Sequence, residues 1–223
     1  MSTNIKKFYD DFNFADMVLG NRAGSPPPLI AAVVQADVDY VMQRLPHGKD
    51  VLEVGCGFGR LVEELSKISR RVTGIDFSET QLSEARRKVG HIPHVELYNM
   101  HAEQLQFPSD TFEAAVCLNS SLGNMPGIEA QVIKEMVRVT KPGGLIAVHV
   151  FANVQELREA QLINYRRLNL TNIQDQGNAV TTDEGFYSRR FTERDLEELF
   201  ANAGLTPVIT QETSGSLLAE AIK

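Results

Sequence analysis

The stretch VLEVGCGFG, residues 51–59, decides the fold of this 223-residue chain. Val51, Leu52 and Val54 favour a β-strand. The three alternating glycines that follow favour a tight loop, because glycine adopts positive φ angles and lets a ligand approach the backbone closely. Residues 60–66, RLVEELS, then have helical spacing. A strand, a glycine loop and a helix in this order predict a nucleotide-binding turn.

The spacing of these glycines argues against a dinucleotide. The dinucleotide fingerprint G-x-G-x-x-G requires its last glycine where this chain has Arg60. Glu53 would repel a pyrophosphate, but it would attract the amino group or the sulfonium of S-adenosylmethionine (SAM). Asp76 ends the next predicted strand, residues 71–76, about twenty residues after the first glycine, where an acid can bind a ribose diol. The pattern therefore predicts a ligand that carries a ribose and a positive charge.

With these features, residues 45–150 resemble the class I, Rossmann-like, SAM-dependent methyltransferases. Residues 53–59 match the E/D-x-G-x-G-x-G loop of that family, and Asp76 matches its ribose-binding acid. The resemblance implies an α/β fold with a doubly wound, mostly parallel seven-stranded sheet. One strand of the C-terminal pair is expected to be the antiparallel strand in that sheet. It also implies SAM as the cofactor.

The resemblance assigns cofactor contacts to the glycine loop and to the ends of the following strands. The turn at residues 100–107 stands where the family often has an acid, Ala and Glu, and here His101 replaces the acid. His101 is interpreted as a residue at the edge of the cofactor, with an ordinary surface turn as the alternative. The predicted cofactor residues are Glu53, Gly55, Cys56, Gly57, Gly59, Asp76, Phe77, His101, Ala102, Glu103 and Asn119.

The remaining pattern predicts one domain over residues 1–223, with an N-terminal lid (1–28) and a small cap insertion (152–190) added to the sheet. Predicted helix caps are Ser25, Ser78 with Gln81, and Thr192 with Asp195. Predicted helices are parts of 4–20, then 27–45, 78–89, 128–139, 154–168 and a last one from Thr192 to Gly204. Further strands are expected at 95–98, 112–118, 145–151, 205–213 and 217–222, with a turn at 141–144 and a hairpin over 180–191.

Composition limits the classes of partner. The formal charge of −7 and the sequence pI of about 5.3 oppose binding to nucleic acid, whose affinity comes largely from phosphate neutralisation. No run approaches the ~20 apolar residues of a membrane span. Cys56 and Cys117 fall in separate predicted core elements, which favours free thiols and a cytoplasmic protein. No Cys/His spacing of metal-binding type occurs, so no metal is expected.

Methyl transfer from a sulfonium needs alignment and exclusion of water, and it needs a base only where the acceptor must lose a proton. His149 interrupts a buried strand near its carboxyl end and is the candidate base, with a hydrogen-bonded core histidine as the alternative. Asn119 is the candidate for orienting the acceptor through its amide, although such an amide often satisfies the backbone instead. Asn119 lacks the N/D-P-P-Y context of enzymes that methylate exocyclic base amines.

The lid and the cap insertion are the segments that the sheet does not need, so both are expected to close over the site. Phe8, Phe12 and Phe14 are expected to give the lid an apolar side. The predicted acceptor-binding residues are Tyr9, Asn124, Tyr165, Tyr187 and Arg189. Three functions remain open: methyl transfer to an N, O or C nucleophile of a small molecule, a non-catalytic SAM-binding regulatory subunit, and a nicotinamide-dependent oxidoreductase. A homodimer is left open.

Overall fold

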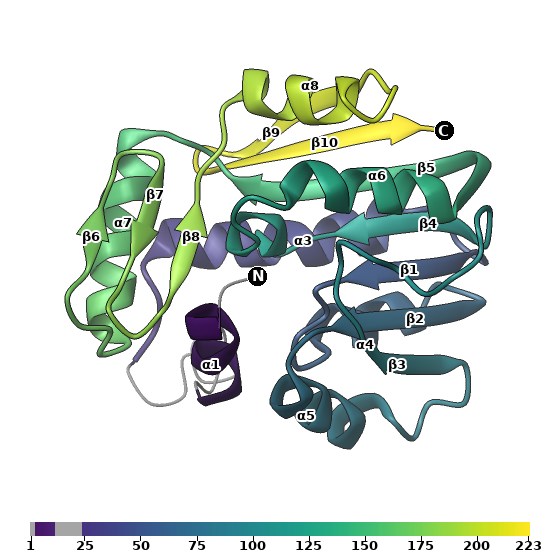
Figure 1. Cartoon of the computed structure of the whole chain (residues 1–223), viewed down its shortest axis with the longest axis horizontal. Helices are drawn as coiled ribbons and strands as arrows, with labels where there is room; N and C mark the ends of the chain where they lie inside the picture. Colours follow the sequence, from purple (N-terminus) through teal and green to yellow (C-terminus); the bar gives the residue numbers. More distant parts are fainter. Residues whose placement is uncertain (1–2, 12–23) are drawn as a thin grey trace.

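The computed structural model describes residues 3–11 and 24–223 of the chain (Figure 1). Its centre is a seven-stranded sheet in the order β3-β2-β1-β4-β5-β10-β9. The strand β10 runs antiparallel to both of its neighbours, and the other pairs are parallel. This confirms the predicted doubly wound, mostly parallel α/β sheet. The strands are β1 (Asp50–Val54), β2 (Arg71–Asp76), β3 (Val95–Asn99), β4 (Phe112–Cys117), β5 (Thr140–Phe151), β9 (Val208–Thr213) and β10 (Ser216–Ile222).

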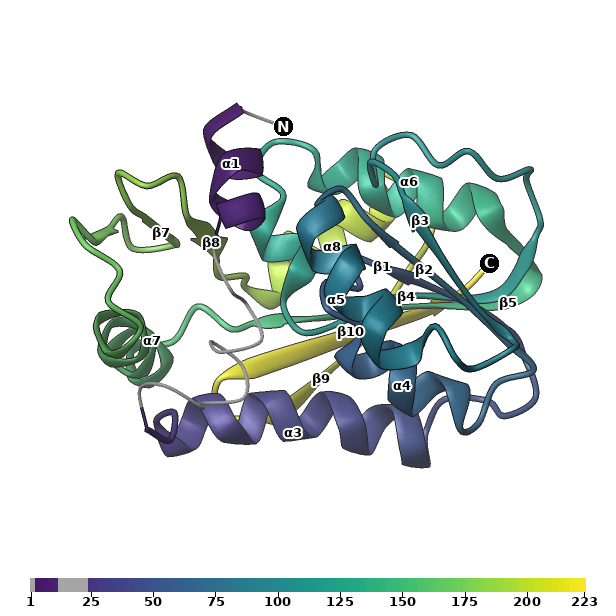
Figure 2. The same ribbon diagram turned by 90° about the horizontal axis from the view of Figure 1, so that it is seen from below.

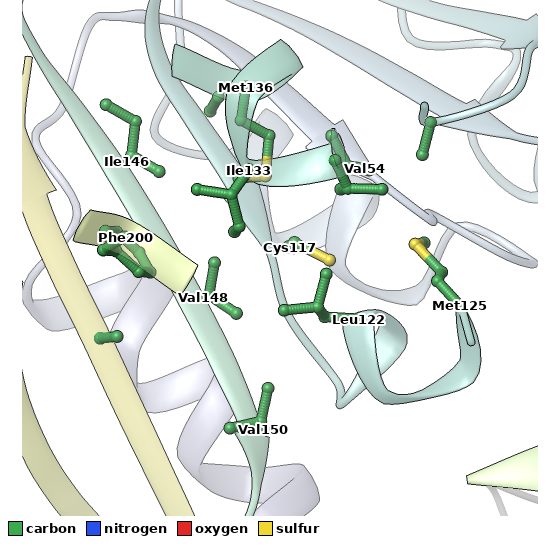
Figure 3. Close-up of a cluster of buried hydrophobic side chains, with 14 of the residues drawn as sticks. Val54, Cys117, Leu122, Met125, Ile133, Met136, Ile146, Val148, Val150 and Phe200 are labelled. Carbon is green, nitrogen blue, oxygen red and sulfur yellow. The ribbon is translucent and has the colours of Figure 1, made fainter. Parts of the chain in front are cut away.

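Helices cover both faces of the sheet (Figure 2). One layer consists of α3 (Pro28–Gln43), α4 (Arg60–Ser66) and α5 (Glu79–Val89), and the other of α6 (Glu129–Val139) and α8 (Glu193–Ala201). Successive side chains of a strand point to opposite faces, so Val51 packs in the first layer and Leu52 in the second. In the second layer, Ile133 and Met136 of α6 lie over the strand side chains (Figure 3). Within the described ranges, no helix is long and apolar enough to cross a membrane.

The order of the strands places a crevice beside β1. The strands β2 and β3 extend the sheet to one side of β1, and β4 begins the other side, so the direction of winding reverses between β1 and β4. Ligands of open α/β sheets bind at such a point, outside the carboxyl ends of the strands. The glycine loop follows β1 there, and the short 3₁₀ helix η1 (Ser121–Asn124) follows β4. Ser121 Oγ donates a hydrogen bond to Gly55 O (3.1 Å), which joins the two loops.

The cap lies beyond these carboxyl ends. It contains α7 (Gln155–Arg167) and a small antiparallel sheet of β6 (Gln174–Asp175), β7 (Ala179–Thr181) and β8 (Tyr187–Arg189). The N-terminal helix α1 (Thr3–Asp11) lies between this sheet and α5 (Figure 1). Its Phe8 ring is 5.3 Å from Phe186, and its Tyr9 ring is 5.5 Å from Phe77. These aromatic contacts join α1, the cap and the end of β2 into one apolar cluster.

Two local predictions are wrong. Ser25 does not cap α3, because the helix begins at Pro28 after Pro27 without a side-chain cap. The segment Lys141–Gly144 is not a separate turn but lies inside β5, at the point where the pairing of β5 with β4 shifts register. Gly143 N–H donates to Lys223 O (2.8 Å) there, so the end of the chain supplies a partner. The expected contacts of Phe12 and Phe14 lie outside the described residues.

Candidate cofactor and acceptor site

The three glycines of the loop have positive φ angles of 74°, 50° and 81° at Gly55, Gly57 and Gly59. A Cβ atom at Gly55 would lie 2.9 Å from Ser121 Cβ, and one at Gly59 would lie 3.1 Å from Ala85 Cβ. At Gly57 a Cβ atom would meet nothing within 4 Å. The outer two glycines are therefore required by packing, whereas Gly57 faces open space and leaves its backbone accessible to a ligand.

Asp76 ends β2 beside this loop and is 8% exposed. Its Oδ2 accepts a hydrogen bond from Gly57 N–H and its Oδ1 accepts one from Ser78 N–H, both at 2.9 Å. Burial raises the pKa of the Asp76 carboxyl to about 6, while the N–H groups of Ser78, Gly57 and Phe77 act in the opposite direction. The carboxylate is consequently ionised at neutral pH and lies in the cavity wall.

Glu53 and Arg60 lie in the same cavity wall. Burial raises the pKa of Glu53 to about 8, although the Arg60 charge lowers it. Arg60 Nη2 donates to Asp37 Oδ2 and Arg60 Nη1 donates to Val34 O, each at 3.2 Å. Glu53 Oε2 and Arg60 Nε have no hydrogen-bond partner among the described residues. Because an unpaired buried polar atom costs about 1–3 kcal/mol, these two atoms are suited to receive polar groups of a ligand.

The structure corrects the prediction that His149 faces the acceptor. Its side chain is buried outside the cavity lining, and its Nδ1 is 2.8 Å from Asp37 Oδ1. The same carboxylate oxygen accepts a hydrogen bond from Asn119 N–H (2.9 Å). Burial acts to raise the pKa of Asp37, but His149, Arg60 and the Asn119 amide hold it below its ordinary value. His149 is thus a paired core histidine that helps to fix the end of β4, and Asp37 is a residue that the sequence did not single out.

The cavity extends from the glycine loop to the cap, so residues of both segments line one continuous space. Most of its lining beyond the loop is apolar or aromatic. The lining beyond the loop includes Tyr9, Pro26, Ile30, Val34, Phe77, Asn119, Asn124, Phe151, Asn164, Tyr165, Phe186 and Ser188.

Two predicted acceptor residues lie elsewhere. Along the strand β8, Ser188 lines the cavity, as does Phe186 just before it, whereas Tyr187 and Arg189 do not. Alternate side chains of a strand point to opposite sides, so a cavity that contacts Ser188 excludes both of its neighbours. Arg189 instead pairs with Glu129 (3.1 Å) and with Asp195 (2.7 Å). The interpretation of Tyr187 and Arg189 as acceptor residues is therefore corrected.

The predicted turn at residues 101–103 lines a second, smaller hollow. Gly55, Asp76, Phe77 and Met125 line both spaces, so the two adjoin. His101, Ala102 and Glu103 are among the residues that line only the smaller one. The rings of Phe77 and His101 are stacked with centroids 6.2 Å apart. This placement brings together every predicted cofactor residue except Gly59, whose role is in packing. Their contacts with a cofactor stay predictions.

The sheet order, the glycine loop and the acid at the end of β2 agree with the fold that the resemblance to class I, Rossmann-like, SAM-dependent methyltransferases implies. Residues 51–144 match a family model described as a methyltransferase domain. A demethylmenaquinone methyltransferase of Lysinibacillus sphaericus is 36% identical over 124 residues, which are 54% of this chain and 50% of that protein. The chain spans about half the length of the curated relatives it matches.

Solved structures show the same fold at low sequence identity. A SAM dependent methyltransferase from Aquifex aeolicus has a TM-score of 0.66 and 18% identity, over 95% of this chain and 99% of that one. A second structure is the 1,6-didemethyltoxoflavin-N1-methyltransferase of Burkholderia thailandensis with bound 1,6-didemethyltoxoflavin and S-adenosylhomocysteine. It has a TM-score of 0.62 and 20% identity, and the match covers 86% of this chain and 78% of that one.

Proposed function

We propose that this chain transfers the methyl group of SAM to an N, O or C nucleophile of a small-molecule acceptor. One observation carries the proposal: a single cavity is lined by Gly57 and Asp76 at one end and by Tyr165 and Phe186 of the cap at the other. A non-catalytic SAM-binding subunit would require the end of the cavity at Gly57 and Asp76, but it would not require an acceptor pocket at the cap. The nicotinamide alternative is disfavoured by Arg60, which stands where the dinucleotide fingerprint requires its last glycine.

The residues at the loop fit SAM. Gly57 leaves room for a ligand against the backbone, and the Asp76 carboxylate is placed to accept hydrogen bonds from a ribose diol. The unpaired atoms of Glu53 and Arg60 offer one acceptor and one donor, which suits the ammonium and carboxylate of an amino acid. When bound, SAM supplies the methyl group on an activated sulfonium.

The chain's own contribution is alignment and exclusion of water. The ionisable lining groups Glu53, Arg60 and Asp76 belong to the cofactor end of the cavity, and the acceptor end is formed mainly by aromatic and amide side chains. Such walls orient an acceptor and desolvate its nucleophile, which are the main requirements of an in-line displacement. Asn119, which follows β4, and Asn124, at the end of η1, are proposed to orient the acceptor between the two ends.

The names of the similar proteins support a small-molecule acceptor. The curated relatives are called demethylmenaquinone methyltransferases, and the Burkholderia enzyme was solved with 1,6-didemethyltoxoflavin. A cytoplasmic location and a homodimer stay predictions.

The proposal is tested in two steps on the full chain. Titration calorimetry with SAM, S-adenosylhomocysteine and NAD is expected to give binding of the first two and none of NAD. Release of S-adenosylhomocysteine is then measured across a metabolite library. Binding of NAD in place of SAM would contradict the proposal, and SAM binding without turnover of any ring compound would favour the regulatory subunit.

A further inference from the structure

The backbone of the glycine loop offers little to a phosphate group. In phosphate-binding loops, backbone N–H groups without a partner in the protein point at the ligand. Four N–H groups of this loop instead bond within the protein, those of Gly55, Cys56, Gly57 and Gly59. The first two donate to Ile75 O and the third to Asp76 Oδ2, all at 2.9 Å, and the fourth donates to Cys56 O at 3.0 Å. These groups are therefore not available to hold a phosphate.

Arg60 is the group in the cavity wall that can attract a phosphate instead. Among the described residues that line the cavity, it is the one lysine or arginine. A guanidinium is always charged, and its planar set of N–H groups matches the oxygen atoms of a phosphate. The side chain is 11% exposed, and its Nε has no hydrogen-bond partner within the described ranges. An arginine in this place would favour phosphorylated nucleotides unless its charge were balanced.

Asp37 on α3 supplies this balance from outside the cavity lining. The side chain is 0% exposed, and its Oδ2 accepts a hydrogen bond from Arg60 Nη2 at 3.2 Å. Its Oδ1 accepts one from Asn119 N–H (2.9 Å) and lies 2.8 Å from His149 Nδ1. Burial acts to raise the pKa of Asp37, but His149, Arg60 and the Asn119 amide hold it below its ordinary value. A fixed negative charge therefore accompanies the guanidinium.

Glu53 contributes less of this balance than the sequence predicts. Burial raises the pKa of its carboxyl to about 8, although the Arg60 charge lowers it. The group is mainly protonated at pH 7, and a neutral carboxyl does not repel an anion. Asp37 is consequently the ionised carboxylate that contacts Arg60.

We propose that Asp37 determines the specificity of the cofactor site, because its charge beside Arg60 excludes nucleotides that carry phosphate on the 5′ oxygen of the ribose. The amino acid of SAM is a zwitterion, so Asp37 attracts its ammonium and repels its carboxylate, and the two effects oppose each other. A diphosphate has only negative charge. Specificity of this kind acts against the competitor and needs no contact between Asp37 and the ligand.

The inference rests on the proposed function, which places the ribose at Asp76 and the 5′ substituent toward Arg60. It adds a residue that acts through Arg60 and selects between classes of adenosine derivative. Asp76 is also ionised, but adenosine and its 5′-diphosphate share the ribose. A comparison of these two ligands therefore isolates the effect of the phosphate groups.

The test measures binding of adenosine and of adenosine 5′-diphosphate to the full chain. Each is titrated by calorimetry in competition with S-adenosylhomocysteine, so that both affinities refer to the same cavity. The parent is expected to bind the diphosphate at least about tenfold more weakly than adenosine. Asp37→Asn removes the charge and keeps an oxygen for the Asn119 N–H and for His149. In this variant the diphosphate is expected to gain about tenfold in affinity and adenosine to stay within about twofold.

Three further variants show where the effect comes from. Asp39→Asn removes the same charge at an exposed position two residues further along α3 and is expected to keep the parental ratio of affinities. Asp37→Glu keeps the charge, so exclusion of the diphosphate is expected to remain. In Asp37→Asn combined with Arg60→Gln, the gain is expected to be lost, because no guanidinium remains to bind the phosphate groups.

A purely structural role of Asp37 would weaken both ligands alike, so an unchanged ratio in folded Asp37→Asn overturns the inference. A parent that binds the diphosphate as tightly as adenosine overturns it without any variant. Where Asp37→Asn does not fold, Asp37→Ser, which leaves space for a water molecule, takes its place beside the parental ratio. A parent that does not bind S-adenosylhomocysteine would contradict the proposed function, and the inference with it.

Discussion

Glu53 is a carboxyl group that is buried away from water. It is 3% exposed, and burial raises its pKa to about 8, with Arg60 acting in the opposite direction. A raised carboxyl pKa stabilises the fold at low pH, and this contribution is lost as the pH rises through the folded value. At pH 7 the group is mainly protonated, which lowers the cost of burying it.

This protonation predicts that SAM binding releases a proton. An ammonium group beside Glu53 favours the carboxylate, so the pKa of Glu53 falls when SAM binds, and affinity rises with pH between about 6 and about 7.5. Calorimetry in buffers of different ionisation enthalpy is expected to count up to about one proton released at pH 7. Glu53→Gln should abolish the release and Glu79→Gln, on the surface of α5, should keep it. Equal release from the parent and Glu53→Gln would remove Glu53 from the SAM site.

Three residues, Glu53, His149 and Ser188, show why the site was only partly predictable from the sequence. The spacing of Glu53 and the glycines has a chemical meaning that can be read locally, and their placement in one cavity agrees with it. The partner of His149 is Asp37, 112 positions away, and no local pattern indicates that pairing. On β8 the choice between Ser188 and its neighbours depends on which side of the strand faces the cavity, and sequence alone does not determine this.

At the scale of elements, the glycine loop separates packing from binding. Gly57→Ala introduces a Cβ atom into open space at φ 50°, which costs about 1–2 kcal/mol of backbone strain. Gly59→Ala has the same strain and also a contact of 3.1 Å with Ala85. We expect Gly57→Ala to fold and to lose at least about tenfold in SAM affinity, and Gly59→Ala to be the less stable of the two. Thermal unfolding and calorimetry measure both, and parental SAM affinity in Gly57→Ala would contradict the assignment.

The helix α3 is attached to the sheet through Asp37. The Asp37 carboxylate contacts Arg60, His149 and the Asn119 N–H. The Asp37 side chain is 0% exposed. Removing one partner of a buried ionic network leaves the others unpaired, so Asp37→Ala is expected to lower the free energy of unfolding by about 3–5 kcal/mol. Urea unfolding measures the change. Asp39→Ala, two residues further along α3 and exposed, serves as the control and is expected to stay within about 0.5 kcal/mol.

Element ends were predictable where a side chain makes the cap. Ser78 Oγ accepts from Gln81 N–H, and Thr192 with Asp195 forms a complete capping box, as expected from their spacing. Pro27 precedes α3 and favours its start through its fixed φ angle. Ser25, two residues earlier, was wrongly predicted to be the helix cap. The segment Lys141–Gly144 was misread because its strand partner is the distant C-terminus.

At the scale of the whole molecule, α1 closes one side of the cavity. Tyr9 lines it, and Tyr9 O accepts hydrogen bonds from Ser78 Oγ (3.2 Å) and Gln81 Nε2 (3.1 Å). Deletion of residues 1–20 is expected to keep SAM affinity within a few-fold, because the loop and Asp76 remain. Methyl transfer should slow by about 100-fold through lost alignment. Parental turnover by the folded, truncated chain would show that the N-terminal segment is not a lid.

The attachment of α1 to the turn after Asp76 also affects the order in which the cofactor and the acceptor enter and leave the cavity. The Tyr9 ring makes an edge-on contact with Phe77 at the cofactor end of the cavity. Tyr9 also belongs to the apolar cluster that contains Tyr165 and Phe186 of the cap at the acceptor end. An acceptor seated beneath the cap would stand between the nucleoside and the exit. Steady-state kinetics are therefore expected to be sequential and ordered, with SAM first on and S-adenosylhomocysteine last off. S-adenosylhomocysteine should inhibit competitively against SAM and non-competitively against the acceptor, and competitive inhibition against both would indicate random entry.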